Sequence, residues 1–584
     1  MDQANVIDHG ARPVPSERQP DPLNNQAAAH PWLASYPPGV PAEIDVARLG
    51  TLVDLFETSA TAFAGRPAIL CFGSTMTYAT LSQQARDLAA WLQAEGLAKG
   101  DRVAVMLPNV PAYAVAIFGV LLAGGTIVNT NPLYTPRELT HQLNDSGARI
   151  LIVLENFGPT VAGALPDIAL DRVVLVGPGD GLGLKGRVIN LASRHVRKAV
   201  PPFRLPEGLA VPFAAALNRG RALPRARAKV DPEDLAFLQY TGGTTGIAKA
   251  AMLSHRNIMA NVEQAQLWFG SKDPSVARCC VTALPLYHIF ALTACFFQFM
   301  RSGGSCLLIP NPRDCDGMVK TLSRTPFTHL MGVNTLFNVL INHPKIGTVD
   351  FSKLDFVVGG GTAVQRAVAE RWKALTGNTI IEGYGLSETS PVVCVNPRGI
   401  REFSGTIGFP LPSTEVSIRD ASGEPVPAGE PGEICVRGPQ VMRGYWNRPD
   451  ETARAMTADG FFRTGDIAIR LPDGQFKIVD RMKDMILVSG FNVYPNEVED
   501  VLAAHPGVLE CAVVGAPSPE TGEMVVAHVV RKDPSLTPDT LRAYARTQLT
   551  GYKVPRNVVF HETLPKTNVG KVLRRMLRDE MPEA

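Results

Sequence analysis

The segment with the clearest chemical potential is residues 240–255, YTGGTTGIAKAAMLSH. Glycine adopts positive φ without a Cβ clash, so a Gly-rich turn can aim successive backbone N–H groups into one concavity. Threonine hydroxyls add hydrogen-bond donors, and a lysine adds a mobile positive charge. The pattern predicts a cradle for phosphate oxygens, although a flexible surface loop uses the same residue types. The cradle residues are Thr241, Gly242, Gly243, Thr244, Thr245, Gly246 and Lys249.

A phosphate loop of the Walker type does not fit this spacing. Such a loop places its lysine directly after a glycine, with Ser or Thr directly after the lysine. Here Lys249 follows Ala248 and precedes Ala250. The sequence therefore excludes a kinase or ATPase of that kind, and other motifs must identify the phosphate compound.

Five further segments carry side chains suited to chemistry. They are LPLYHIFALT with His288, GYGLSETSP with Glu388, FRTGD with Asp466, DRMKD at residues 480–484, and PKTNVGKVLRR with Lys571. Each one alone is compatible with a structural role. Glu388 could be an acid at a helix start, Asp466 a turn residue at a strand end, and His288 a buried structural histidine.

Composition restricts the class of protein. A chain of 584 residues is expected to form two or more domains. With 45% hydrophobic and 19% charged residues it reads as globular, and a net charge of +2 excludes a global basic field for nucleic acid. None of its nine cysteines forms a C-x-x-C pair, so buried reduced thiols in a cytosolic protein are expected.

Neither a signal peptide nor a membrane span is predicted. The first twenty residues are polar and lack an apolar core. The most hydrophobic run, residues 113–128, is too short to cross a bilayer and is interrupted by paired glycines. It predicts a buried helix that leads into a buried strand.

Hydrophobic patterning predicts α/β architecture. A helical pattern at residues 81–97 alternates with strand patterns at 102–108 and 149–154, which favours parallel buried strands. Strands predicted at residues 355–361 and 378–385 end in glycines, where such sheets usually meet a ligand. After residue 415 the pattern becomes β-rich, and the last hundred or so residues predict a separate small domain.

Positive charge gathers before the cradle, between residues 185 and 204. The cationic side chains there are Lys185, Arg187, Arg194, His195, Arg197, Lys198 and Arg204. A solvated basic face is the default interpretation of such a run. Contact with an anionic membrane surface is the alternative.

In order and spacing these motifs resemble the acyl-adenylate-forming (AMP-binding) superfamily, and among its members the bacterial long-chain fatty-acid–CoA ligases. The resemblance covers residues 32–578 and includes LQYTGGTTGIAK and DRMKDMILVSGFNVYPNEVED. It implies two steps. A fatty-acid carboxylate attacks the α-phosphorus of ATP to give an acyl-adenylate and pyrophosphate, and the thiol of coenzyme A then displaces AMP. Cations aimed at the α-phosphate are what the first step requires.

The resemblance also assigns roles. The cradle would hold the β- and γ-phosphates, Glu388 and Thr241 would bind Mg²⁺, and Asp466 would accept the ribose hydroxyls. Arg481 would contact the ribose or phosphate side, and Lys571 would be the adenylation lysine, with His288 as a further catalytic residue. The adenine slot and its phosphate neighbour would comprise Gly359, Gly360, Gly361, Glu382, Gly383, Tyr384 and Ser387. Ser387 replaces the family's usual Thr, and Ala250 its usual Gly.

The implied fold is a large N-terminal domain of layered α/β subdomains plus a β-barrel-like part, followed by a small mobile α+β domain. Its expected divisions are a mobile lead-in (1–48), the large domain (49–480), a hinge linker (480–484) and the small domain (485–584). Lys483 would be the hinge residue. Independently of the resemblance, charged residues on both sides of Met482 predict an exposed linker. Ser489, Gly490 and Phe491 would line the route of the coenzyme A thiol.

Several alternatives stay open at this level. A ligase for a medium-chain or aryl acid has the same chemistry, and an inactive acyl-binding protein is a third reading. We expect a cytoplasmic protein with peripheral contact to the inner face of the cell membrane and no nucleic-acid partner. A homodimer is one option for the oligomeric state, because this subgroup is often dimeric.

Overall fold

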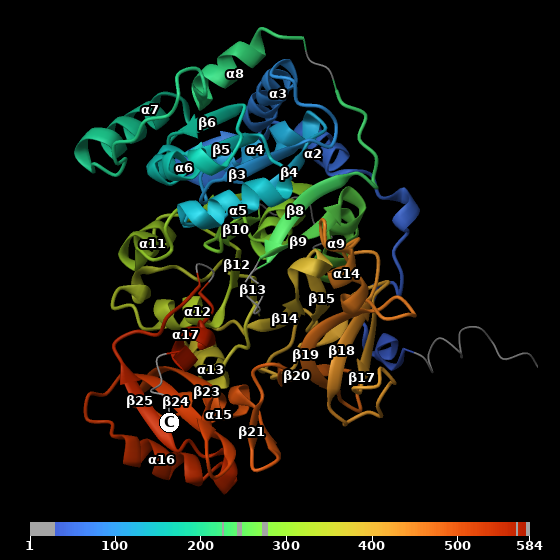
Figure 1. The fold of residues 1–584 in the computed structure, drawn as a ribbon, viewed down its shortest axis with the longest axis vertical. Helices are drawn as coiled ribbons and strands as arrows, with labels where there is room; N and C mark the ends of the chain where they lie inside the picture. Colours follow the sequence, from blue (N-terminus) through green and yellow to red (C-terminus); the bar gives the residue numbers. More distant parts are fainter. Residues whose placement is uncertain (1–29, 225–226, 242–247, 271–277, 568–569, 580–584) are drawn as a thin grey trace, which may run out of the picture.

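The computed structural model describes residues 30–224, 227–241, 248–270, 278–567 and 570–579. Within these residues the chain forms four β-sheets (Figure 1). Two large sheets and a four-stranded sheet precede residue 482, and a five-stranded sheet follows it. This confirms the predicted α/β class with a small α+β domain at the C-terminal end. The predicted phosphate cradle lies largely outside the described residues, because Gly242, Gly243, Thr244, Thr245 and Gly246 are not among them.

The first large sheet has seven strands in the order β7-β6-β5-β3-β4-β8-β9. Neighbours are parallel except β8 and β9, which form an antiparallel pair. Its inner strands are nearly continuous runs of buried aliphatic residues, as a parallel sheet covered on both faces requires. The strands are β3 (Arg102–Met106), β4 (Thr126–Asn129), β5 (Ile150–Leu154), β6 (Arg172–Val176), β7 (Ala210–Pro212), β8 (Leu235–Thr241) and β9 (Lys249–Ser254).

The second large sheet has nine strands in the order β16-β15-β14-β13-β12-β10-β11-β1-β2. The strands from β14 to β1 are parallel, and the outer strands β15, β16 and β2 are antiparallel. Their bounds are β1 (Pro67–Cys71), β2 (Ser74–Thr77), β10 (Cys279–Thr282), β11 (Ser305–Leu308), β12 (His329–Gly332), β13 (Phe356–Gly360), β14 (Ile381–Gly385), β15 (Val392–Val395) and β16 (Phe409–Pro410).

Helices cover both large sheets, and one helix is buried on every side. All twelve residues of α4 (Pro111–Leu122) are buried, and its Phe118 stacks on Phe56 with ring centroids 3.9 Å apart. Phe118 also contacts Phe296 and Phe297, which follow β10, so α4 belongs to the core of both sheets. This confirms the buried helix and strand predicted for residues 113–128.

Most of the remaining helices beside the two large sheets are amphipathic, and their apolar stripes face the sheets. They are α2 (Leu52–Ala62), α3 (Tyr78–Ala94), α5 (Pro136–Ser146), α6 (Gly158–Ala164), α7 (Gly183–Leu191), α8 (Phe213–Arg221), α9 (His255–Phe269), α10 (Gln298–Arg301), α11 (Cys315–Leu322), α12 (Asn334–Ile341) and α13 (Arg366–Thr376). Helix α7 differs, because its apolar side chains Leu184, Val188 and Leu191 are exposed.

The four-stranded sheet and the small domain complete the chain. The sheet is antiparallel and holds β17 (Glu415–Arg419), β18 (Gly432–Arg437), β19 (Phe462–Arg470) and β20 (Phe476–Arg481), with α14 (Pro449–Ala455) beside it. The small domain has a hydrophobic core of its own. It comprises β21 (Ile486–Val488), β22 (Phe491–Val493), α15 (Pro495–Ala503), β23 (Val508–Ser518), β24 (Gly522–Arg531), α16 (Pro538–Arg546), β25 (Asn557–His561) and α17 (Arg574–Asp579).

Three local features of the structure differ from what the sequence pattern indicates. Residues 329–340 show helical spacing in the sequence, but they divide into β12 and α12, with a break at Val333. Asp466 does not end its strand, because β19 continues to Arg470. The linker is not exposed throughout, since Asp480 and Asp484 are buried. Short apolar runs do not distinguish a strand–helix junction from one helix, because both bury the same residue types.

A buried asparagine fixes the loop that carries His288. Asn109 lies before α4, and its Nδ2 donates to the carbonyls of Thr282 and Leu284, both at 2.9 Å. Its Oδ1 accepts the backbone N–H of Leu286 at 2.8 Å. One side chain of the seven-stranded layer therefore satisfies three backbone groups of the loop after β10, a strand of the other sheet.

We predict that Asn109→Ala destabilises the large domain. It leaves the Leu284 carbonyl and the Leu286 N–H without partners, and the Thr282 carbonyl keeps only the Ile309 N–H. This should lower the free energy of unfolding by about 3 kcal/mol. Asn144→Ala is the matched control, because Asn144 makes one exposed hydrogen bond, to Asp167; it should change the free energy by less than about 0.5 kcal/mol. Urea unfolding followed by fluorescence measures both. Equal stabilities of the two variants would contradict the structural role of Asn109.

Candidate active site

The floor of the candidate site is the glycine-rich edge where β13 and β14 end. A Cβ on Gly360 would stand 3.0 Å from the Gly383 carbonyl and 3.3 Å from the Phe290 ring. Gly361 follows with a φ of +74°, a conformation that L side chains rarely adopt. The predicted residues Gly359, Gly360 and Gly361 lie beside Glu382, Gly383 and Tyr384 in the β13–β14 pair, and Gly360 is packed too closely for a larger side chain.

A buried carboxylate stands next to this floor. Asp466 on β19 is 5% exposed, and the Tyr384 hydroxyl donates to its Oδ2 at 2.7 Å. Arg481, its register partner on β20, places Nε 3.2 Å from Oδ1. A carboxylate has about four acceptor positions, so two remain for further donors. The structure thus brings three predicted residues from separate strands into one cluster.

A second buried carboxylate belongs to Glu388, in the short 3-10 turn after β14. Tyr445 donates its hydroxyl to Oε1 at 2.9 Å, and the Glu388 carbonyl accepts the Met442 N–H at 2.7 Å. Burial raises the pKa of Glu388, and the Tyr445 hydrogen bond opposes that shift. Tyr445 was not predicted. A β-bridge between Ala251 of β9 and Tyr445 brings this side chain to the site, and no local sequence motif predicts that contact.

Lys571 reaches this cluster from the small domain. It ends a tight turn in which its carbonyl accepts the Thr567 N–H at 2.7 Å and Gly570 takes a φ of +81°. Its Cε would lie 3.7 Å from a Cβ placed on Gly361. Desolvation and the Arg481 charge lower the pKa of Lys571 to about 8, although Asp466 and Glu388 act to raise it.

Two contacts hold the small domain in this position. Thr335 at the start of α12 donates its hydroxyl to the Gly570 carbonyl at 3.0 Å. One turn later, Asn338 donates to the Leu509 carbonyl at 2.8 Å. Figure 1 shows α12 and α13 facing the small domain below them. The lysine turn is therefore fixed by the helix that follows β12.

His288 faces the same cluster from the large domain. Burial lowers its pKa to about 3, and the Lys571 charge adds to that effect. Its imidazole is therefore neutral near pH 7, so it acts as a neutral donor or acceptor rather than as a cation. The backbone N–H of His288 donates to the Pro285 carbonyl at 3.0 Å, within the loop fixed by Asn109.

The two described ends of the phosphate cradle, Thr241 and Lys249, face each other across the β8–β9 pair. The Lys249 ammonium forms an ion pair with Glu451 of α14 and lies 5.4 Å from the centre of the Tyr445 ring. An incoming anion would have to share Lys249 with Glu451. Glu451 was missed by sequence analysis because it lies about two hundred residues away in the chain.

The predicted hinge and thiol-route residues lie outside the carboxylate cluster. Lys483 is exposed between the two buried linker acids, and Ser489 and Gly490 both take positive φ in the β21–β22 hairpin. Phe491 is exposed and stacks on Tyr552 with ring centroids 5.0 Å apart. Ser387 sits beside Glu388 in the 3-10 turn.

The linker acids are held by the small domain. Asp480 accepts the backbone N–H groups of Arg481 and Asn496, and burial raises its pKa to about 6. Asp484 accepts from Arg578 at 2.8 Å. Arg574, three residues after Lys571, lies within 3.9 Å of both acids and donates to Glu499 at 2.7 Å. The Lys571 segment and the linker thus form one charged network.

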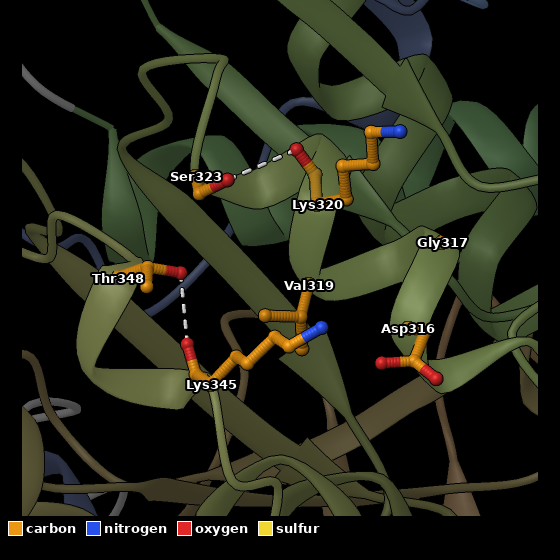
Figure 2. Close-up of a pocket in the computed structure, with 7 residues that line it drawn as sticks. All are labelled: Asp316, Gly317, Val319, Lys320, Ser323, Lys345 and Thr348. Carbon is orange, nitrogen blue, oxygen red and sulfur yellow. Dashed lines mark hydrogen bonds between the residues drawn. The ribbon is translucent and has the colours of Figure 1, made fainter.

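A separate cavity of about 540 Å³ lies between α11 and the turn Ile346–Thr348. Figure 2 shows its lining, in which Ser323 and Thr348 donate to carbonyls of their own turns, those of Lys320 and Lys345. It contains none of the predicted site residues. Among the described residues, no group of three or more His, Cys, Asp or Glu side chains is arranged to hold a metal ion.

The fold places the chain in the class of enzymes built from a large N-terminal domain and a small C-terminal domain. Residues 56–446 match the AMP-binding enzyme family, and residues 497–571 match the AMP-binding enzyme C-terminal domain. The chain therefore belongs to the AMP-binding enzyme family.

Individual relatives agree with this assignment. Long-chain-fatty-acid–CoA ligases of Escherichia coli O6:H1 and Salmonella typhimurium are 52% and 53% identical to it over 551 residues, 94% of this chain and 98% of each relative. A feruloyl-CoA synthase from Amycolatopsis is 37% identical over 87% of this chain and 94% of its own length. The crystal structure of a benzoate CoA ligase from Burkholderia xenovorans LB400 superposes with a TM-score of 0.78 at 27% identity, covering 91% of this chain and 100% of its own.

We predict that Lys571 titrates near pH 8 in the ligand-free protein. Competitive acylation of lysines, read by mass spectrometry against pH, should give a labelling midpoint of about 8 for this side chain. Arg481→Gln removes a neighbouring positive charge and should raise the midpoint, whereas Asp466→Asn removes a negative charge and should lower it. A midpoint near the ordinary 10.5 that neither substitution moves would show that Lys571 does not occupy this cluster.

Proposed function

We propose that the chain is an AMP-forming ligase that activates a long-chain fatty acid through an acyl-adenylate and transfers the acyl group to coenzyme A. The observation that carries this proposal is the position of Lys571 against Glu388 and Asp466. A cation and two carboxylates from two domains meet at a glycine-walled floor. The substrate class is taken from the relatives at 52–53% identity, which span 94% of this chain.

The chain's own residues supply the electrostatics of adenylation. Asp466 keeps two acceptor positions for the vicinal ribose hydroxyls, after Tyr384 and Arg481 have used the other two. The Lys571 ammonium would stabilise charge that develops on the α-phosphate as the fatty-acid carboxylate attacks and pyrophosphate leaves. Because the ammonium is already desolvated, little solvent must reorganise when that charge appears.

The buried carboxylate of Glu388 fits a Mg²⁺ site completed by ATP phosphates. Mg²⁺ prefers oxygen ligands and is commonly held by one or two carboxylates plus substrate phosphates. Tyr445 occupies one Glu388 oxygen and leaves acceptor capacity on the carboxylate, and the Thr241 hydroxyl would be the second protein ligand. When bound, Mg²⁺ neutralises phosphate charge. In the described chain Lys249 is the cradle cation that would assist there.

Thioester formation requires a different arrangement of the same parts. With Lys571 beside Gly361, its turn would occupy the approach to the acyl carbonyl, so a thiol would need the small domain to move. We propose Lys483 as the hinge, because it is exposed between the buried Asp480 and Asp484. Ser489, Gly490 and Phe491 would then line the thiol's route, from a hairpin with two consecutive positive-φ residues.

Attachment to the inner face of the cell membrane through residues 185–204 remains part of the proposal, as does a cytoplasmic location. No helix in the described part of the chain is long and apolar enough to cross a bilayer. A water-insoluble substrate is collected where it partitions, and cations near an anionic surface each contribute about 1 kcal/mol. A homodimer remains one option for the assembled state.

We predict that ATP–pyrophosphate exchange depends on a long-chain fatty acid and on Lys571. The wild-type chain should catalyse ATP–pyrophosphate exchange with hexadecanoate and not with ferulate. The feruloyl-CoA synthase serves as the comparison enzyme for the aryl-acid alternative. Lys571→Ala should lower exchange about a hundredfold or more, because one cation is lost at the reacting phosphate. The same variant should still convert preformed hexadecanoyl-AMP and coenzyme A to the thioester.

Three results would contradict parts of this account. Exchange with ferulate but not hexadecanoate would make the chain an aryl-acid ligase. No exchange with any acid, together with tight binding of hexadecanoate, would indicate an inactive acyl-binding protein. Equal loss of both half-reactions in Lys571→Ala would remove its assignment to adenylation, and Lys571→Arg, which keeps the charge, serves as the control.

A further inference from the structure

Helix α7 is inverted relative to an ordinary surface helix. Its inward positions are small or polar, and Gly186, Asn190 and Ser193 are all buried. Leu184, Val188 and Leu191 recur at i, i+4 and i+7, and they point outward with exposures between 60% and 77%. A surface helix normally buries its apolar stripe. In α7 the small and polar side is buried, so its exposed apolar stripe is unlike the other surface helices of the fold.

The inverted orientation is locked by specific contacts. Asn190 donates to Asp180 at 2.8 Å and accepts the Gly179 N–H at 2.7 Å. A Cβ on Gly186 would lie 1.9 Å from the Gly179 carbonyl, so the helix backbone is pressed against that loop. The Asn190 amide is therefore satisfied only in this orientation. These contacts therefore fix the outward orientation of the apolar stripe.

Further apolar side chains extend the stripe. Val196, in the π-helical turn Ala192–Val196 that continues α7, is 79% exposed. Phe72 lies in the β1–β2 turn, which Lys185 contacts by donating to the Gly73 carbonyl at 2.7 Å. Leu184, Val188, Leu191 and Val196 are the four most exposed large hydrophobic side chains of the described chain. We call residues 183–198 together with Phe72 the α7 face.

Cations frame these apolar residues. Arg187 lies within the stripe, and His195, Arg197 and Lys198 follow it; all four are exposed. None of them makes a side-chain hydrogen bond or ion pair with any described residue. Arg194 differs, because it is bound to the buried Glu155 with Nη2 2.7 Å from Oε2. The free positive charge therefore rests on Arg187, Arg197 and Lys198, with Arg194 as a structural anchor.

We propose that the α7 face is a lipid-docking surface that inserts Leu184, Val188, Leu191 and Val196 into the interface of an anionic bilayer. An apolar stripe with cations at its border matches both layers of such a surface, the acyl boundary and the anionic headgroups. Arg187 can keep its charge among headgroups while its stem lies along the stripe. This proposal rests on the proposed function for its biological sense, because a fatty acid resides in a bilayer.

The position of the face is compatible with domain movement. Figure 1 shows α7 at the opposite end of the molecule from α16 of the small domain. Docking through α7 therefore leaves the small domain free to move. Insertion also goes beyond the purely electrostatic contact expected from the charge run, since it predicts binding that high salt weakens but does not abolish.

The test uses the full-length protein and vesicles of phosphatidylcholine with about one quarter phosphatidylglycerol, read by co-sedimentation at low and high salt. Leu184→Ser with Val188→Ser and Leu191→Ser should lower partitioning at least about tenfold at both salt concentrations. Arg187→Gln with Arg197→Gln and Lys198→Gln should lower it about fivefold per cation at low salt and less at high salt. The control is Leu133→Ser with Leu375→Ser and Val559→Ser, exposed side chains elsewhere, and should bind as wild type.

A second readout reports insertion directly. Tryptophan in place of Val188 should shift its emission to shorter wavelength on vesicles and be quenched by lipids brominated on their acyl chains. Unchanged partitioning of the serine variant, absence of vesicle binding by wild type, or no quenching at residue 188 would overturn the proposal. A serine variant that instead changes the protein from dimer to monomer would also overturn it, because the face would then join two copies.

Failure of the proposed function is separable from failure of this inference. Pyrophosphate exchange with hexadecanoate in detergent micelles does not need a bilayer, so the serine variant should retain it. If exchange is absent from every form, the ligase proposal fails, while sedimentation and quenching still decide whether the α7 face binds lipid.

Discussion

The structure depends on one electrostatic constraint, which is that a lysine ammonium from the small domain is held out of water among charges of the large domain. Desolvation and Arg481 lower the pKa of Lys571 to about 8, while Asp466 and Glu388 offset part of that cost. An isolated desolvated cation would be unfavourable, so the carboxylates must already be in place. This explains why Asp466 is fixed by Tyr384 and why Glu388 sits in a short turn anchored to Met442.

The same constraint accounts for the division into domains. Under the proposed function, a rigid site with Lys571 permanently in place would leave no approach for a thiol to the acyl carbonyl. The turn that carries the lysine accepts a hydrogen bond from Thr335, and Asn338 donates to Leu509 elsewhere in the small domain. Arg574 ties that turn to Asp480 and Asp484, so movement of the lysine and bending of the linker are mechanically coupled. Polar contacts of this kind can be exchanged for water at modest cost.

Sequence analysis predicted the α/β class from local periodicity, and the fold confirms it. The resemblance assigned Asp466, Glu388 and Lys571 to one predicted site, and the structure places these side chains near one another. Sequence analysis did not identify Tyr445, Asn109 or the Glu451 partner of Lys249, which depend on contacts between distant segments. It also predicted an exposed linker, because charged residues usually lie outside, whereas two linker acids are buried against arginines. The inversion of α7 was equally invisible, since cation-rich composition does not reveal which helix face is buried.

The most direct test of the account is to lock the small domain where it stands. A Cβ on Gly570 would lie 3.9 Å from the Thr335 Cβ, close to the mean of about 3.8 Å in disulfides. Thr335→Cys combined with Gly570→Cys should therefore form a cross-link on oxidation. Because Cys at position 570 must adopt a φ of +81°, the reduced double variant, which carries the same strain, is the control. Our account predicts that the oxidised protein keeps fatty-acid-dependent pyrophosphate exchange but loses acyl-CoA formation, with recovery on reduction. Acyl-CoA formation by the cross-linked protein at the rate of the reduced one would contradict it.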